Sequence, residues 1–126
     1  MSQYVETPTK TFECGAAIAQ HLRVVLSAGK LAAAGITARE LGTLESASFA
    51  SGDLRAVRLR TAAGTVKMVA NGIVALGAKV YTAASGQISA TQGSGSYPVG
   101  DALEAATANN DVIEVLREAH GYASAA

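Results

Sequence analysis

The sequence is poor in the residues from which most binding sites for sugars and nucleic acids are built. It contains no tryptophan, two phenylalanines and four tyrosines, which argues against the aromatic platforms of carbohydrate-binding sites. Only 16% of the residues are charged, and ten lysines and arginines balance ten aspartates and glutamates. Because a net charge of zero offers no basic excess for phosphate groups, we expect no nucleic-acid partner.

Long apolar runs and paired cysteines are also missing. No stretch of about 18 apolar residues occurs, so we expect no membrane-spanning helix and no membrane partner. Residues 1–10 are polar and lack the basic and then apolar order of a signal peptide. Cys14 is the only cysteine and cannot form an internal disulfide, so the sequence predicts folding in a reducing cytoplasm.

What the sequence does contain is a series of short β-prone segments separated by turns. Its length of 126 residues suits one domain, and 13 glycines punctuate it. We therefore predict a mainly β fold, a small β-barrel or sandwich with at most short helices. The strands are expected at Arg23–Leu26, Leu41–Ser46, Ala56–Arg60, Thr65–Val69, Lys79–Tyr81, Gln87–Ala90, Val99–Glu104 and Val112–Val115.

Two local patterns give more detailed predictions. In Ala56–Arg60, Val57 and Leu59 alternate with arginines, which indicates a strand with one apolar face. A glycine-containing break before Thr65–Val69 predicts that these two strands form a hairpin. Helix signals are weak and predict no more than a short turn at each of two places, Leu31–Leu41 and Val115–Tyr122.

Parts of the first half of the chain are echoed in the second half. The matching pairs are residues 23–31 with 79–88, Leu44–Ser48 with Leu103–Thr107, and Asp53 with Asp111. In both halves the order is strand, glycine turn, strand, link, Leu-Glu strand, Asp turn and strand. The pattern predicts two similar β units that share one pseudo-symmetric core, and chance similarity in an alanine-rich chain is the alternative.

Side chains that could perform chemistry are few and scattered. His21 and His120 lie near opposite ends of the chain, without Cys, His or Asp neighbours at metal-ligand spacing. Cys14 lies in an alternating segment that favours a buried, inert thiol over a nucleophile. Glu45 and Glu104 each follow a leucine, which favours solvated or interface-facing glutamates over an acid–base pair. We therefore expect no catalytic residue, no metal site and no cofactor, and we do not expect an enzyme.

Charges of opposite sign are segregated along the chain. Between Leu54 and Gly100 all charged residues are cations, namely Arg55, Arg58, Arg60, Lys67 and Lys79. Between Asp101 and Glu118 there are five acids and one cation, namely Asp101, Glu104, Asp111, Glu114 and Glu118 with Arg117. The two groups could lie on adjacent strands of one fold, or they could meet between copies in a ring.

The order of motifs along the chain resembles a known family. The matching segments are residues 11–18 followed by 23–26, residues 64–73 followed by 76–81, and residues 99–107 followed by 111–116. Together they are similar to the small capsid cement or head decoration proteins of tailed bacteriophages and prophages. One departure is the link Ala33–Leu41, which is longer than expected for a relative.

The resemblance implies a structural virion protein without catalytic residues. Such proteins bind the outer surface of the capsid, commonly as homotrimers, and clamp neighbouring subunits of the major capsid protein. Synthesis is then expected in the cytoplasm of the bacterial host. The alternatives are another virion component, such as a head-fibre base or a tail-ring protein, and, from a different class, a small ligand-binding or hydrolytic β module.

The first twelve residues differ in character from the rest of the chain. Residues 1–12 contain Pro8 and no periodic apolar pattern, so we predict an extended arm there and one β-rich domain over residues 13–126. An extended arm could bind by adding a strand to an exposed sheet edge. The residues expected to contact the capsid or another subunit are Tyr4, Val5, Thr7, Thr9, Arg58 and Arg60.

Overall fold

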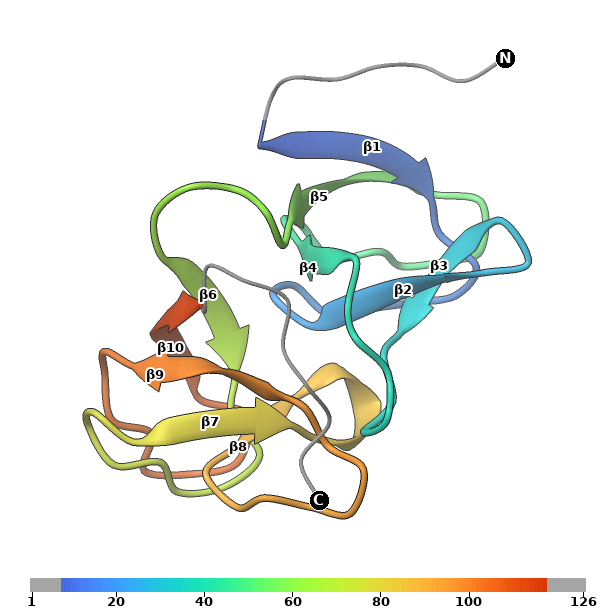
Figure 1. The fold of residues 1–126 in the computed structure, drawn as a ribbon. Coiled ribbons are helices and arrows are strands. Elements are labelled where there is room, and N and C mark those ends of the chain that lie inside the picture. The colour runs from blue at the N-terminus through green and yellow to red at the C-terminus, as the bar shows by residue number, and fades with distance from the viewer. Residues whose placement is uncertain (1–7, 118–126) are drawn as a thin grey trace.

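Two antiparallel five-stranded sheets make up the structure, a computed structural model that describes residues 8–117 (Figure 1). The first sheet has the strand order β1-β5-β4-β2-β3. Its strands are β1 (Thr9–Glu13), β2 (Arg23–Ser27), β3 (Lys30–Ala33), β4 (Gly42–Leu44) and β5 (Leu54–Leu59). The second sheet has the order β6-β10-β9-β7-β8. Its strands are β6 (Val66–Val69), β7 (Lys79–Thr82), β8 (Ile88–Ser89), β9 (Pro98–Ala102) and β10 (Val112–Arg117), with one 3-10 turn, η1 (Ala84–Gly86).

The predicted mainly β architecture and the internal repeat are both confirmed. Strand order in the second sheet repeats that of the first, with β6, β10, β9, β7 and β8 in the places of β1, β5, β4, β2 and β3. A glycine occupies the same place on β4 and β9, and a Cβ at Gly42 or Gly100 would collide with the carbonyl oxygen of Arg58 or Leu116. The close approach of the strands therefore requires glycine in both units.

Each unit buries a hydrophobic core of its own, so the prediction of one shared core is wrong. The first core consists of Cys14, Ile18, Val24, Leu31, Leu44 and Val57. The second consists of Val66, Met68, Ala70, Val74, Val80, Ile88, Val99, Ala102, Ala106, Ile113 and Val115. Alternation explains both sets, because Val57 and Val115 point inward from their strands while the residues beside them are more exposed.

The echo seen in the sequence is displaced by one residue at the Leu-Glu segment. Leu44 is the cross-strand partner of Val57, and Ala102, not Leu103, is the partner of Val115. Leu44 is fully buried whereas Leu103 is 40% exposed. The small Ala102 therefore takes the core position of Leu44, and the sequence match of two leucines is misleading.

The predicted hairpin between residues 56–60 and 65–69 does not form. These segments are β5 and β6, which belong to different sheets, and the chain between them crosses from one unit to the other. A hairpin forms instead between β2 and β3, through Ala28 and Gly29, which both have positive φ. That two-residue turn matches the right-handed twist of the strands, so β3 replaces the start of the helical turn predicted at Leu31–Leu41.

The ends of the predicted elements also need correction. Residues 9–12, assigned to the arm, belong to β1, which pairs with β5 from Thr9 opposite Arg58 to Glu13 opposite Leu54. Val112–Arg117 is strand β10, so the first residues of the predicted terminal turn are extended. The remainder of that turn, and residues 1–7 of the arm, lie outside the described residues.

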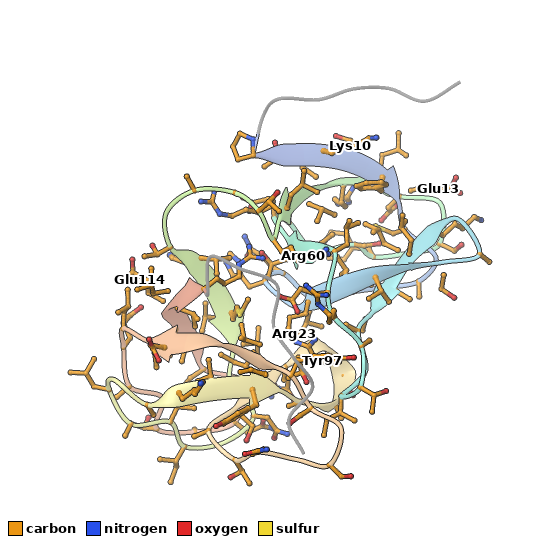
Figure 2. The ribbon with its side chains drawn as sticks, in the orientation of Figure 1. Lys10, Glu13, Arg23, Arg60, Tyr97 and Glu114 are labelled. Atoms are coloured by element: carbon orange, nitrogen blue, oxygen red, sulfur yellow. The ribbon has the colours of Figure 1, made fainter. Side chains whose placement is uncertain are left out.

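A buried arginine of β2, Arg23, joins the two units, and the link between β3 and β4 supplies its carboxylate partner. The Arg23 guanidinium is fully buried and donates to the carbonyl oxygens of Gln87 at 3.0 Å and Ala83 at 2.6 Å, both in the second unit. It also lies 3.6 Å from the buried carboxylate of Glu40, which the link supplies. Arg117 of β10 approaches the other oxygen of Glu40 at 3.9 Å. The long link therefore provides the charge that balances Arg23. Figure 2 shows Arg23 between the two sheets.

Candidate functional site

Three of the predicted contact residues gather at the start of β1, a region called here the arm root. Thr9 is the cross-strand partner of Arg58, and the Leu59 N–H donates to the carbonyl oxygen of Pro8 at 2.9 Å. Arg60 follows directly and donates to the carbonyl oxygen of Glu40 at 3.0 Å. The arm root thus comprises Thr9, Arg58 and Arg60, and it marks where residues 1–7 join the fold. Tyr4, Val5 and Thr7 lie outside the described residues.

A groove of 550 Å³ lies between the two sheets. It is lined by residues of both units, namely His21, Thr43, Glu45, Arg58, Thr65, Val66, Lys67, Glu104 and Glu114. Arg58 is common to the arm root and this intersheet groove. Figure 2 labels Glu114, which the second sheet contributes from β10. The lining is mixed in charge, because it combines glutamates from both units with a lysine and an arginine.

Hydrogen bonds hold the acidic wall of the groove in place. The Thr65 hydroxyl donates to a Glu114 carboxylate oxygen at 2.5 Å. The Glu114 backbone N–H donates to a carboxylate oxygen of Glu104 at 2.8 Å. Glu45 and Glu104 therefore both reach the groove, one from each unit, although they are not equivalent positions of the repeat. The prediction that they are solvated or face an interface agrees with this open position.

Opposite charges lie side by side within the second sheet. Lys67 on β6 is the cross-strand partner of Glu114 on β10, and Lys79 on β7 is the partner of Asp101 on β9. The cationic middle and the acidic end of the chain therefore meet on adjacent strands. This arrangement favours the first of the two alternatives left open by the sequence, since neutralising these pairs needs no second copy.

His21 lies in the groove with an unusual backbone conformation. Its φ is 69°, and Gly77 takes the matching place in the second unit with a φ of 82°. The N–H groups of both residues donate to the corresponding strand, to the carbonyl oxygens of Leu44 and Ala102, each at 2.8 Å. Burial lowers the pKa of His21, Glu45 opposes this, and Lys67 lowers it further. The imidazole therefore favours its neutral form in the groove. His120 lies outside the described residues.

The two repeated aspartates close turns. A carboxylate oxygen of Asp53 accepts the N–H groups of Phe49 and Ala50, and Asp111 accepts those of Thr107 and Ala108. These backbone hydrogen bonds lower the pKa of both carboxyl groups. Each aspartate holds the turn before the second strand of its sheet, β5 in the first unit and β10 in the second, in keeping with their repeated position in the sequence.

Chemistry of other kinds finds little support in the described residues. Cys14 is fully buried in the first core, which confirms the predicted buried thiol. Within residues 8–117 no three His, Cys, Asp or Glu side chains are grouped so that they could hold a metal ion. In the same range no helix is long and apolar enough to cross a membrane.

The fold is that of a small β protein built from two repeated units with a groove between them. The sequence model of one family, described as phage cement protein, matches residues 3–117 of this chain. The chain therefore belongs to the phage cement proteins, which confirms the resemblance seen in its motifs. Membership makes it a structural component of the phage virion that binds the capsid, in a family not known for enzymatic activity. No curated protein matches the chain.

A solved virion structure has a similar fold. The chain is similar to the N base of the head fiber gp8.5 of bacteriophage phi29, with a TM-score of 0.73 and 15% sequence identity. The similarity covers 88% of this chain and 93% of that chain. At such low identity the likeness establishes the shared fold, and that fold extends over both repeated units.

Proposed function

We propose that this protein binds the outer surface of a phage capsid and stabilises it by bridging neighbouring subunits of the major capsid protein. The observation that carries the proposal is the match of the cement family across residues 3–117. It is further supported by the arm root, where a polar segment joins the fold beside exposed Arg60. Many weak contacts repeated on a lattice give high avidity without any single strong interface.

The proposed assembly is a homotrimer, and residues 1–7 supply a contact that the folded units do not. An extended segment binds well by adding a strand to an exposed sheet edge. Tyr4, Val5 and Thr7 belong to this segment, whereas Thr9 is already part of β1. Removal of residues 1–7 therefore spares the first sheet and is a cleaner test than removal of the whole predicted arm.

The test mixes purified protein with undecorated, expanded capsids of the phage that encodes it. We expect saturable binding at a fixed number of copies per capsid and a higher temperature of capsid disruption. The variant lacking residues 1–7 is expected to bind with lower occupancy while its circular dichroism and melting temperature stay unchanged. Full occupancy of that variant would contradict the proposed role of the arm.

A second candidate is the base of a head fibre, for which the fold of the phi29 head fiber N base is the specific observation. In that case another virion protein would bind the capsid through this chain. Purified virions separate the two candidates. If removing this protein also removes a fibre from the virion while the capsid keeps its disruption temperature, the fibre-base function is favoured.

A further inference from the structure

A small pocket beside the crossing from the first unit to the second is lined by two arginines and by no acidic side chain. Its volume is 280 Å³. Residues 60–64, which connect β5 to β6, line it together with Leu116 and Arg117 of β10. Both units therefore contribute to this pocket, which is called here the arginine pocket.

The charge of the arginine pocket differs from that of the intersheet groove. The groove lining combines glutamates with Arg58 and Lys67. The lining of the pocket contains the guanidinium groups of Arg60 and Arg117 and no carboxylate. A concave site lined by charge of one sign attracts ligands of the opposite sign. The arginine pocket therefore suits a negatively charged ligand.

Arg60 brings a charge that the fold does not neutralise. Its guanidinium donates to the backbone carbonyl oxygen of Glu40 at 3.0 Å, and within residues 8–117 it forms no ion pair. The Glu40 carboxylate lies instead 3.6 Å from Arg23 and 3.9 Å from Arg117. One carboxylate thus already faces two guanidinium groups, and Arg60 adds further positive charge. Figure 2 shows Arg60 between the two sheets.

The loop that lines the pocket supplies neutral hydrogen-bond donors as well. Within the described chain, the N–H groups of Ala63 and Gly64 form no hydrogen bond, and both residues are exposed. Gly64 has a φ of 89°, and successive N–H groups beside a residue of positive φ are a common anion-binding arrangement. Arg58 donates to the Ala63 carbonyl oxygen at 2.6 Å, which holds the loop and brings another guanidinium to it.

Comparison of the two units shows that the fold does not require an arginine at position 117. Arg117 lies opposite Gly100 of β9, and Leu59 takes the same place opposite Gly42 of β4. Leu59 packs against the first core. The Arg117 side chain is only 7% exposed. Because a nearly buried guanidinium often contributes no more to stability than a well-packed apolar side chain, its presence indicates a role besides folding.

We propose that the arginine pocket binds a single oxyanion, either a carboxylate or a phosphate group. A guanidinium presents paired N–H donors that match both groups, and the loop adds its N–H groups. The volume lies just below the range of pockets for drug-sized molecules, about 300–1,000 Å³, so the pocket suits a small ion or the end of one side chain. The carboxylate would come from an acidic side chain of another protein chain, and the phosphate from solution. The proposal goes beyond the proposed function and does not depend on it.

NMR titration of the full-length, ¹⁵N-labelled protein tests the proposal. Sodium phosphate and sodium acetate are the probes, and sodium chloride at equal ionic strength is the control. We expect saturable shifts of the backbone signals of Ala63 and Gly64 and of the side-chain signal of Arg60 with a probe, and none with chloride.

Two variants that each remove one positive charge from the same part of the chain give the matched comparison. Arg60→Gln keeps an amide that can donate to the Glu40 carbonyl but lacks the charge, and we expect its affinity for the probe to fall about tenfold or more. Arg55→Gln removes a guanidinium that already pairs with Asp53 at 3.4 Å, and we expect it to bind like the wild type. If Arg60→Gln does not fold, Arg60→Lys, which loses the paired donors, takes its place with weaker binding expected.

The two probes also distinguish the sources of the ligand. Saturable shifts with acetate support a carboxylate of another protein chain, and shifts with phosphate alone support free phosphate. Equal shifts with chloride, no shifts at the pocket, or equal affinities of the Arg60 and Arg55 variants would each overturn the proposal. The proposed function is tested on capsids and this site on the isolated protein, so either can fail without the other.

Discussion

The two units of this protein share their backbone but not their surroundings, and the comparison separates residues that hold the fold from residues that serve a partner. Gly42 and Gly100 are retained because the strands approach too closely for any side chain. By contrast, the first residue of β2 is the buried Arg23, while the first residue of β7 is the exposed Lys79. Residues that are the same in both units are those that the fold requires, and residues that differ reflect the different surroundings of each unit.

Breaking the buried contact between the units is expected to have the largest effect. Arg23→Met takes the guanidinium 3.6 Å from the buried Glu40 carboxylate away, so we expect a loss of about 3–5 kcal/mol in the free energy of unfolding. The matched variant is Lys79→Met, at the exposed equivalent position, for which a change within about 0.5 kcal/mol is expected. Urea denaturation measures both. Equal losses in the two variants would mean that Arg23 does not join the units as described.

Placing a side chain at the shared glycines tests whether the repeat is structural. Gly42→Ala and Gly100→Ala each drive a methyl group into a carbonyl oxygen of the adjacent strand, and a loss of about 1–3 kcal/mol is expected for each. Gly35→Ala is the control, because no atom lies within 4 Å of the place that its added methyl group would take. Thermal melting compares the three proteins. If only one of the two shared glycines is sensitive, the units are not equivalent at this contact.

His21 and Gly77 share a left-handed backbone position, and substitutions there are expected to change stability less, with opposite signs in the two units. His21→Gly is expected to relieve backbone strain and Gly77→Ala to introduce it, each by about 1–2 kcal/mol.

Burial lowers the pKa of His21 in the fold, so wild-type stability should fall as the pH drops through 6.5, the ordinary histidine value. His21→Gly removes that dependence. A pH profile of melting temperature that is unchanged in the variant would show that His21 is not the group responsible.

Protonation of the two turn aspartates gives the smallest effect, which is confined to acid. Backbone N–H groups lower the pKa of Asp53 and Asp111 below the ordinary 3.8. Because the folded state holds the charged form more strongly, their contribution is present above that value and is lost as the pH falls through the lowered pKa. Asp53→Asn and Asp111→Asn should each reduce the loss of melting temperature that the wild type shows as the pH falls below 3.8. Identical acid limbs in wild type and variants would refute this assignment.

The sequence is a good guide to the strands and a poor guide to their partners. Alternation in residues 56–60 locates β5, and each of the eight predicted strands overlaps an observed one. Alternation does not say which strand lies alongside, so the crossing from β5 to β6 looks like a hairpin in the sequence. The turn at Gly29 is expected from the repeated glycine-turn pattern, but the positive φ of Ala28 beside it is not, because alanine rarely adopts that conformation.

The site is only partly predictable for a related reason. The groove brings His21 together with Glu104, and no local pattern joins residues so distant in the chain. The arginine pocket does leave a signal, since a correct alignment of the repeats sets Arg117 against Leu59. That alignment requires Ala102 to be recognised as the equivalent of Leu44, because each pairs with the buried valine of the adjacent strand. The sequence match of Leu44 with Leu103 conceals this equivalence.

Binding of the purified wild-type protein to undecorated, expanded capsids tests the central claim most directly. We expect saturation at a fixed number of copies per capsid, together with a rise in the temperature at which the capsid breaks open. Capsids that remain undecorated at saturating protein, with an unchanged disruption temperature, would contradict the proposed function.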